Sequence, residues 1–244
     1  MAKATIYTSL MSSKTITVKE CPLSGDLPYH MNINKVLSNP ELFDTISLLV
    51  ETTIKTKELS KDLKFNKICA TSSSAIPYAT NIATSFEKGI LYITNEGNDV
   101  NDKDNIKNLK IEGGMNIDDK VLIVETIVSN DFLLHNIVEK IKKYGGNVVG
   151  IIILLNQCEG EYVNLTKQIE RLIPILNIYD IINYLENNNL IEIFYCERVK
   201  FYCEKQTKFN IKKLLESDKK EIIENIEIIE PKETIESTDI AVVN

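Results

Sequence analysis

The sequence predicts an α/β fold in which a parallel sheet is covered by helices on both faces. Two continuous apolar runs, at residues 120–128 and 147–155, indicate buried strands, and a short strand precedes them at residues 67–71. Such runs are typical of strands buried on both sides, because a sheet face open to water alternates apolar with polar residues. Segments with helical patterns lie between the runs, and strands that alternate with helices form parallel sheets.

Helices are also predicted on either side of the first strand. Residues 39–56 have an apolar stripe at helical spacing, Asn39 can cap that helix, and Pro40 suits its first turn. Residues 72–86 begin as a polar turn and continue as a helix, and residues 89–94 read as a further buried strand. These elements extend the alternation of helices and strands.

The helix that follows the strand at 120–128 has clear signals at both ends. Ser129, Asn130 and Asp131 are each able to cap its first turn. Gly145 and Gly146 follow its last turn, where glycine commonly ends a helix. The next buried strand begins directly after these glycines.

The chain divides into a domain of residues 1–215 and an acidic, isoleucine-rich tail of residues 216–244, which we expect to be mostly mobile. The segments not yet assigned are short extended pieces over 1–36, a strand at 173–176, a helix at 177–189 and a helical stretch over 190–215. No internal repeat is present.

Composition excludes several classes of protein. The 244 residues carry a net charge of −7, which argues against a generally basic surface for nucleic acid. No apolar run approaches the roughly 18 residues of a membrane span, and residues 1–19 do not read as a secretory signal. The five cysteines match no zinc pattern and the two histidines are far apart, so we expect no metal site and a cytoplasmic location.

Arginine is scarce in this chain. Only Arg171 and Arg198 are present, and the other basic residues are lysines. The guanidinium group is the usual fork for phosphate and carboxylate ligands. An enzyme that needs a guanidinium group to bind its substrate would have to use a different hydrogen-bond donor in this chain. The shortage of arginine also fits drift in an AT-biased genome.

The order of the motifs resembles the orotate phosphoribosyltransferase domain of eukaryotic UMP synthase. The resemblance covers roughly residues 15–208, and it is carried by the segments ICATSSSAIPYAT at 68–80, IEGGMNIDDKVLIVETIV at 111–128 and VVGIIILLNQCEG at 148–160. It implies a type I phosphoribosyltransferase fold with a small N-terminal hood and a helical C-terminal region. It also implies a sugar-phosphate site after the strand at 120–125.

The resemblance assigns site residues to the segments that follow two of the predicted strands. The family's sugar-phosphate motif has two acidic residues for the ribose hydroxyls; Glu125 matches the first, and Thr126 stands at the second. The turn of Ser72, Ser73 and Ser74 corresponds to the pyrophosphate side. From the residues alone, the three serines suit either a small anion nest or, more commonly, a turn and helix cap.

The family's 5′-phosphate loop is rich in threonine, serine and glycine, and this chain departs from it. Ser129 is compatible and Asn130 follows, but Asp131 puts a negative charge where a phosphate would lie. Phe132 and Leu133 put bulk where glycine allows close approach. The loop suits a helix cap better than a phosphate site.

The pyrophosphate and orotate sides also depart from the family pattern. The family follows the strand at 89–94 with basic residues, whereas residues 95–110 read here as an acidic loop. It binds the orotate carboxylate with a hairpin arginine, absent from residues 29–34, and an Asp-Arg turn, replaced by Asn156 and Gln157. Cations at these places would stabilise departing pyrophosphate and anionic orotate.

Three alternative functions are compatible with these residues. The first is a catalytically inactive orotate phosphoribosyltransferase-like protein that serves as an interaction, structural or regulatory subunit, as a homodimer or with another protein, and needs no cofactor. The second is a divergent orotate phosphoribosyltransferase in pyrimidine synthesis that uses Mg²⁺. The third is a nucleotide or anion sensor with donors from Ser72–Ser74 and Ser129. The lost cations favour the first.

The sequence also leads to predictions for residues outside these motifs. Cys69 and Cys158 are expected to be buried, inert thiols, and His135 to be solvated. An aromatic cluster near the C-terminal end reads as core, or as a dimer face with aromatic anchors: Phe194, Tyr195, Phe201 and Tyr202. The acidic loop at 95–105 is the best place for a new partner surface.

Overall fold

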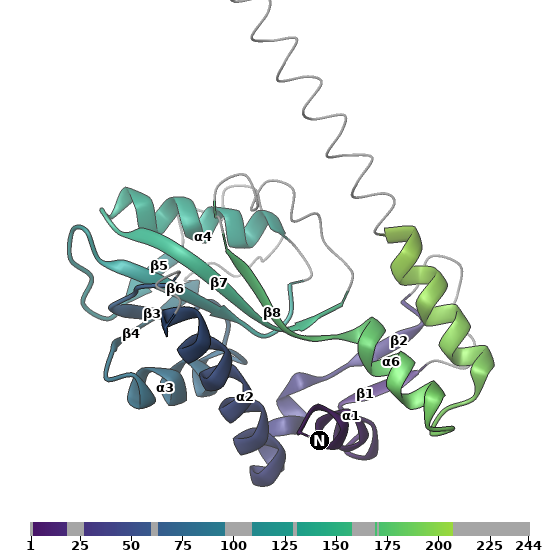
Figure 1. The fold of residues 1–244 in the computed structure, drawn as a ribbon. Coiled ribbons are helices and arrows are strands. Elements are labelled where there is room, and N and C mark those ends of the chain that lie inside the picture. Colours follow the sequence, from purple (N-terminus) through teal and green to yellow (C-terminus); the bar gives the residue numbers. More distant parts are fainter. Residues whose placement is uncertain are drawn as a thin grey trace, which may run out of the picture.

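A six-stranded sheet forms the centre of the computed structural model (Figure 1). The structure describes residues 2–18, 27–59, 63–95, 109–128, 131–157, 169 and 171–206. The strand order is β5-β4-β3-β6-β7-β8. In that order the strands are β5 (Leu109–Glu112), β4 (Gly89–Asn95), β3 (Lys67–Ala70), β6 (Lys120–Glu125), β7 (Asn147–Asn156) and β8 (Leu172–Asn177).

The sheet is parallel except at one edge. The β3–β4, β3–β6, β6–β7 and β7–β8 pairs are parallel, and β5 pairs with β4 in the antiparallel direction. This pairing confirms the predicted parallel sheet. The prediction of a loop over residues 95–110 is wrong at both ends of that range, because Asn95 is the last residue of β4 and Leu109 is the first residue of β5. Residues 96–108 lie outside the described part of the chain.

Helices cover both faces of the sheet, as predicted. Helices α2 (Pro40–Leu59) and α3 (Ile76–Ser85) lie on one face, and α4 (Asp131–Lys143) lies on the other (Figure 1). Successive residues of β6 serve opposite faces: Leu122 packs in the α2/α3 cluster and Ile123 in the α4 cluster. Burial on both faces explains why this strand is apolar without alternation.

The helix boundaries follow the local signals. The side chain of Asn39 accepts a hydrogen bond from the Leu42 N–H at 3.1 Å, so it caps α2 as expected. Helix α4 begins at Asp131, and Gly145, with φ of 86°, donates to Lys142 O at its end. A positive φ is the conformation that favours glycine at this position.

The N-terminal region forms a hood beside the sheet. It comprises α1 (Ala2–Ser12), the antiparallel pair β1 (Ile16–Val18) and β2 (Tyr29–Met31), and the 3₁₀ helix η1 (Ile33–Ser38). The prediction of extended pieces over 1–36 is confirmed for β1 and β2, and it is wrong for residues 33–36, which belong to η1, and for residues 2–12, which form α1. Its serines, threonines and β-branched residues are weak helix formers, and tertiary burial of Ile6 and Leu10 overrides that preference.

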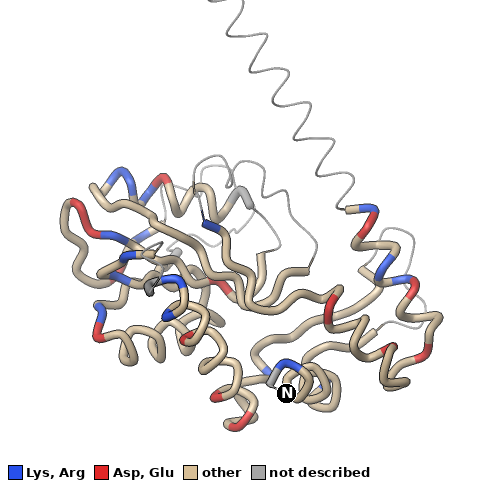
Figure 2. The backbone as a smooth tube through the Cα atoms, viewed as in Figure 1, with Lys and Arg blue, Asp and Glu red and all other residues tan. Residues whose placement is uncertain are grey.

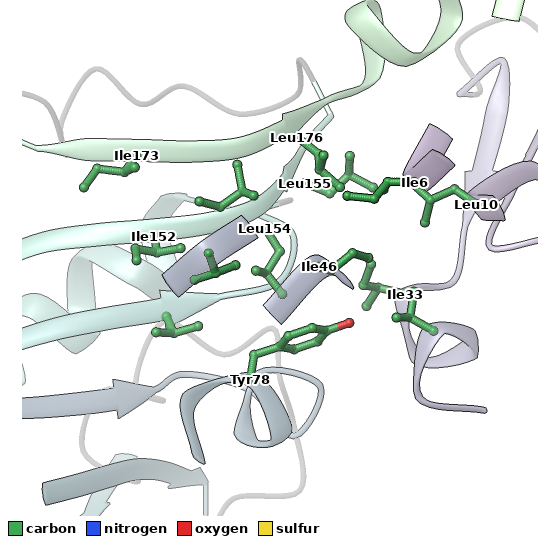
Figure 3. Close-up of a cluster of buried hydrophobic side chains, with 14 of the residues drawn as sticks. Ile6, Leu10, Ile33, Ile46, Tyr78, Ile152, Leu154, Leu155, Ile173 and Leu176 are labelled. Atoms are coloured by element: carbon green, nitrogen blue, oxygen red, sulfur yellow. The ribbon is translucent and has the colours of Figure 1, made fainter. Parts of the chain in front are cut away.

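One apolar cluster joins the hood to the sheet. Ile6 and Leu10 of α1 belong to the same cluster as Leu155 of β7 and Leu176 of β8, near the carboxyl ends of those strands (Figure 3). The hood therefore packs against the carboxyl ends of the strands, where α/β proteins bind their ligands.

Two helices follow the sheet, α6 (Ile178–Asn187) and a second over residues 193–206. The Lys200 ammonium donates to the Glu186 carboxylate and joins the two helices. Both helices match the prediction; the domain boundary at 215 and the predicted tail lie outside the described residues. No described helix is both long and apolar enough to cross a membrane.

Candidate functional site

The predicted site lies where β3 and β6 end side by side. The parallel register pairs Ala70 with Val124, so the next residues, Thr71 and Glu125, are neighbours at the carboxyl edge of the sheet. The turn that leads into α3 starts on one strand, and the sugar-phosphate motif follows the other. The fold thus brings together two segments that are about fifty residues apart in the sequence.

The Glu125 carboxylate is hydrogen-bonded through both of its oxygens. The Ser72 hydroxyl donates to Oε1 at 2.8 Å, and the Thr71 hydroxyl donates to Oε2. The Thr126 N–H also donates to Oε1 at 2.6 Å, and the Thr126 hydroxyl lies 3.1 Å from the same oxygen. Glu125 therefore bridges β6 to the turn that follows β3.

A second layer of hydroxyls supports this bridge. Ser74 Oγ lies 2.8 Å from the Thr126 hydroxyl and 3.0 Å from Ser72 Oγ. Thr126 is 2% exposed, so the second position of the motif is packed inside the protein and not presented to solvent. Ser73 is exposed and takes no part in the network among the described residues. We call Thr71, Ser72, Ser74, Glu125 and Thr126 the hydroxyl–carboxylate network.

The serine turn is confirmed, whereas the predicted helix cap is wrong. Ser72 O accepts from the Ala75 N–H at 3.0 Å, which closes the turn before α3. The N-cap residue of α3 is Ala75, which has no capping side chain. The serine hydroxyls instead turn toward Glu125 and Thr126, because a carboxylate accepts a stronger hydrogen bond than a neutral partner.

The structure describes only part of the segment that the resemblance aligns with the family's 5′-phosphate loop. Ser129 and Asn130 lie outside the described residues, as do the side chains of Asp131 and Phe132. Leu133 is 37% exposed on the first turn of α4. The expected clash of Asp131 with a phosphate therefore stays a prediction.

The hood is fastened to the sheet by a residue that the sequence analysis missed. The Tyr29 hydroxyl donates to the main-chain oxygen of Gln157 at 2.5 Å, and Tyr29 is 1% exposed. The ring of Tyr202 packs edge-on against Tyr29, with centroids 6.3 Å apart. The segments at 29–34 and 156–157, expected from the resemblance to flank orotate, thus meet directly. The alternation of Tyr29, His30 and Met31, with a polar residue between two larger ones, was the signal available in the sequence.

Two neighbouring strands of the sheet contain no charged residue. Strands β7 and β8 carry no charged residue along their length, and Figure 2 shows the charges interspersed over helices and turns. Lys110, near the predicted pyrophosphate side, forms an ion pair with Glu112 at 2.8 Å. Among the described residues, no cluster of His, Cys, Asp and Glu is arranged to hold a metal ion.

The other expectations have mixed outcomes. Cys69 is fully buried, while Cys158 lies outside the described residues. The expectation for His135 is wrong: the residue is half-buried, and its Nδ1 is buried without a hydrogen-bond partner in the described part of the chain. The core interpretation of the aromatic cluster fails for Phe194 and Phe201, which are 57% and 70% exposed.

Comparison with known proteins decides the relationship. No protein-family model matches the chain. An orotate phosphoribosyltransferase from Methanocaldococcus jannaschii is 26% identical over 153 residues, which is 63% of this chain and 80% of that protein. The chain is a homologue of orotate phosphoribosyltransferases. The uridine 5′-monophosphate synthase of Bos taurus is 25% identical over 173 residues, which is 71% of this chain but 34% of that longer protein.

Solved structures support the fold assignment. The orotate phosphoribosyltransferase from Aeropyrum pernix matches this phosphoribosyltransferase-like chain with a TM-score of 0.60 at 16% identity, over 77% of this chain and 99% of its own. The UMP synthase of Leishmania donovani matches with a TM-score of 0.66 at 17% identity, over 84% of this chain and 43% of its own. The chain has the type I phosphoribosyltransferase fold, which confirms the resemblance found in the sequence.

The hood contact leads to a stability prediction. Tyr29→Phe removes the hydrogen bond to Gln157 O and leaves a buried carbonyl without that donor, so the free energy of unfolding is expected to fall by about 1–3 kcal/mol. Tyr78→Phe is the matched control, because the buried Tyr78 hydroxyl has no partner among the described residues. Urea titration of both variants measures the difference. Equal losses would contradict the hood contact.

A second prediction concerns Cys69. Burial raises the pKa of its thiol to about 12. Because the thiolate is the reactive form, we expect no labelling of Cys69 by iodoacetamide at pH 8 in the folded protein, and rapid labelling in urea. Mass spectrometry of the tryptic peptides separates Cys69 from the other cysteines. Rapid labelling of the native chain would contradict its burial.

Proposed function

We propose that this chain is a non-catalytic orotate phosphoribosyltransferase-like protein that acts as an interaction, structural or regulatory subunit. The observation that carries the proposal is the state of Glu125. Its carboxylate is occupied by hydroxyl and amide donors from its own chain. The residue aligned with a ribose ligand here acts as a brace between two strands.

The network opposes the inherited use of Glu125. Ribose hydroxyls would have to displace Thr71 and Ser72 from the carboxylate, and each displaced hydroxyl would need a new partner. Thr126 also supplies no second negative charge, and it is itself bound to Ser74. Binding energy that is used to break these contacts is no longer available to stabilise a transition state.

The hood contact adds independent support. Orotate in the related enzymes is expected to lie between the first hairpin and the turn after the strand that β7 represents. In this chain, Tyr29 and Gln157 close that space with a direct hydrogen bond. Neither residue offers a cation for the orotate carboxylate, and cations at that place are needed for charge-assisted recognition.

Turnover is the test of this proposal. The full chain is mixed with orotate, phosphoribosyl diphosphate and Mg²⁺, and the loss of orotate absorbance is compared with that of a heat-denatured sample and of an active orotate phosphoribosyltransferase. We expect the native and denatured samples to give the same rate. Turnover above the denatured sample that Glu125→Ala abolishes would refute the proposal.

A divergent orotate phosphoribosyltransferase is the second candidate. It is favoured by the relatives named orotate phosphoribosyltransferase and by the placement of Glu125 at the carboxyl end of β6. In that case Mg²⁺ would accompany the diphosphate substrate, and the lysines of the 95–110 segment would stabilise the leaving group. The same assay decides between the two candidates.

An anion sensor is the third candidate, and the hydroxyl cluster of Ser72, Ser74 and Thr126 favours it. The predicted donor Ser73 is apart from this cluster. A ligand that binds only the folded state raises the melting temperature, and the stabilisation grows with the logarithm of the ligand concentration above Kd. A rise with UMP or inorganic phosphate that Ser74→Ala removes would favour the sensor, and no rise would remove it. A cytoplasmic location stays a prediction under all three.

A further inference from the structure

The edge of the sheet opposite the candidate site is rich in lysine. Strands β4, β3, β6 and β7 run parallel and begin at this edge, whereas the hydroxyl–carboxylate network lies at the other ends of β3 and β6. Three of these strands begin at a lysine or directly after one, and the last turn of α4, which leads into β7, contains three more. We call these residues the lysine edge: Lys67, Lys88, Lys120, Lys140, Lys142 and Lys143.

Hydrogen bonds between the turns hold this edge in one arrangement. The Asp119 carboxylate, on a residue that is 5% exposed, accepts from the Asn66 side chain at 2.8 Å and from the Asn116 N–H at 2.7 Å. Asn66 Oδ1 in turn accepts from the Lys120 N–H at 2.7 Å. The Asn147 N–H donates to Asp119 O at 2.8 Å and adds the start of β7. The lysines therefore project from a fixed backbone.

Few carboxylates offset these ammonium groups. Among the described residues, Lys142 is the only lysine of the edge that forms an ion pair, with Glu139 at 3.1 Å. Glu87 and Asp118 are the exposed carboxylates of the turns at this edge. Figure 2 shows several blue segments gathered at this end of the molecule, together with a few red ones. The lysine edge is therefore positive, although the chain as a whole is acidic.

Two large apolar side chains are exposed among these lysines. Ile117 is 79% exposed and Tyr144 is 55% exposed. The Lys140 ammonium lies 5.7 Å from the centroid of the Tyr144 ring. Ile117 lies against the next residue, Gly145, where an added Cβ would be 3.2 Å from the Ile117 Cγ1. A positive surface with exposed apolar groups is complementary to a segment that carries both carboxylates and aliphatic side chains.

The C-terminal part of the sequence contains such a segment. Residues 221–230 read EIIENIEIIE, which is four glutamates, five isoleucines and one asparagine. Residues 216–244, which include this segment, hold nine acidic residues and three lysines. They therefore carry −6 of the net charge of −7 and leave −1 for residues 1–215. The acidic and aliphatic content of 221–230 is the complement of the lysine edge.

We propose that residues 221–230 bind to the lysine edge of the same chain, with their glutamates on the ammonium groups and their isoleucines on Ile117 and Tyr144. The twenty residues from 207 to 226 span up to about 65 Å when extended, against a radius of gyration of about 17 Å for a domain of 200 residues. The segment can therefore reach the lysine edge from the helix over 193–206, which Figure 1 shows beside α6 and β2. Attachment to the same chain raises its effective concentration, so individually weak contacts suffice.

Carbodiimide cross-linking of the full-length chain locates the contact, because this reagent joins a carboxylate only to an amine in direct contact with it. Mass spectrometry is expected to find amide links from the glutamates of 221–230 to Lys120 or Lys143. Lys35, exposed on η1 and outside the lysine edge, is the internal control and is expected to give no link to this segment. In about 1 M NaCl the links are expected to disappear, because exposed charges are then screened.

Variants of Lys143 are measured by the yield of links at Lys120, which is left unchanged. Lys143→Glu is expected to lower that yield at least about threefold, because it replaces an attraction for the segment by a repulsion. Lys143→Arg keeps the charge and is the matched control, with the yield expected to stay at the wild-type value. Lys35→Glu makes the same charge change in the hood and is also expected to leave the yield unchanged. Circular dichroism of each variant checks that the fold is retained.

Three results would overturn the proposal. The first is the absence of links between 221–230 and any residue of the lysine edge. The second is an equal yield at Lys120 in Lys143→Glu and Lys143→Arg, which would exclude an electrostatic contact there. The third is a mixture of unlabelled and nitrogen-15-labelled chains in which the links join only different chains. None of these depends on turnover or on substrate, so this proposal and the non-catalytic function succeed or fail separately.

Discussion

Glu125→Ala is expected to lower the free energy of unfolding by about 2–3 kcal/mol. The substitution removes the acceptor for the hydroxyls of Thr71 and Ser72 and for the main-chain N–H of Thr126. Thr126 is 2% exposed, so water cannot readily replace the lost acceptor there. Urea denaturation followed by circular dichroism gives the difference from the wild-type chain.

The sign of this effect separates a structural carboxylate from a catalytic one. A carboxylate kept for substrate is often a cost to stability, and its removal leaves the protein unchanged or more stable. Glu112→Ala is the matched control, because the Glu112 carboxylate forms an exposed ion pair with the half-exposed Lys110 in the described part of the sheet edge, and we expect a loss under about 1 kcal/mol. A Glu125→Ala protein as stable as the wild type would contradict the bracing role.

Gly113→Ala is expected to destabilise the chain by about 3 kcal/mol, from backbone strain and overpacking together. Gly113 follows β5 with φ of 95°, a region that residues with a side chain rarely adopt. A Cβ at this position would also lie 2.6 Å from the main-chain oxygen of Ile90 in β4. Neither the turn nor the strand can move without disturbing the edge of the sheet.

The adjacent glycine provides the control for this prediction. A Cβ on Gly114 would meet nothing within 4 Å, so Gly114→Ala is expected to change stability by less than about 0.5 kcal/mol. Thermal unfolding of the two variants side by side gives the comparison. Similar melting temperatures would show that the turn adapts, against the rigid geometry described here.

The central strands were predictable because their burial leaves a direct mark on composition. Residues 121–124 of β6 are fully buried, with alternate residues in the clusters on the two faces. A strand under that constraint tolerates little besides valine, isoleucine and leucine. The caps of α2 and α4 were predictable for a similar reason, since Asn39 and Gly145 satisfy local backbone requirements.

Elements that depend on distant contacts were not predictable. Helix α1 contains few strong helix formers, and it is stabilised by packing of Ile6, Tyr7 and Leu10 against other elements. Strand β5 has only four residues and is defined by its pairing with β4. Short segments of this kind have too few residues for a periodic signal.

Four residues of the hydroxyl–carboxylate network were singled out from the sequence, but Thr71 and the hydrogen bonds that join the five residues were not. The resemblance placed Ser72, Ser74, Glu125 and Thr126 near one another, and the structure brings them into one network. The hydrogen bonds from the chain's own hydroxyls to Glu125 could not be predicted, because they depend on how side chains from two different strands are oriented. The register that sets Ala70 against Val124 brings these hydroxyls to Glu125, and that register is a property of the folded sheet.

Binding of phosphoribosyl diphosphate tests the central claim most directly, because an occupied carboxylate opposes binding before any chemistry begins. The full chain at about 100 µM is titrated with phosphoribosyl diphosphate and Mg²⁺ by calorimetry, a concentration that detects micromolar to sub-millimolar affinity. We predict no saturable heat, while an active orotate phosphoribosyltransferase titrated in parallel gives a complete isotherm. A saturable isotherm for the wild-type chain that Glu125→Ala abolishes would contradict the account.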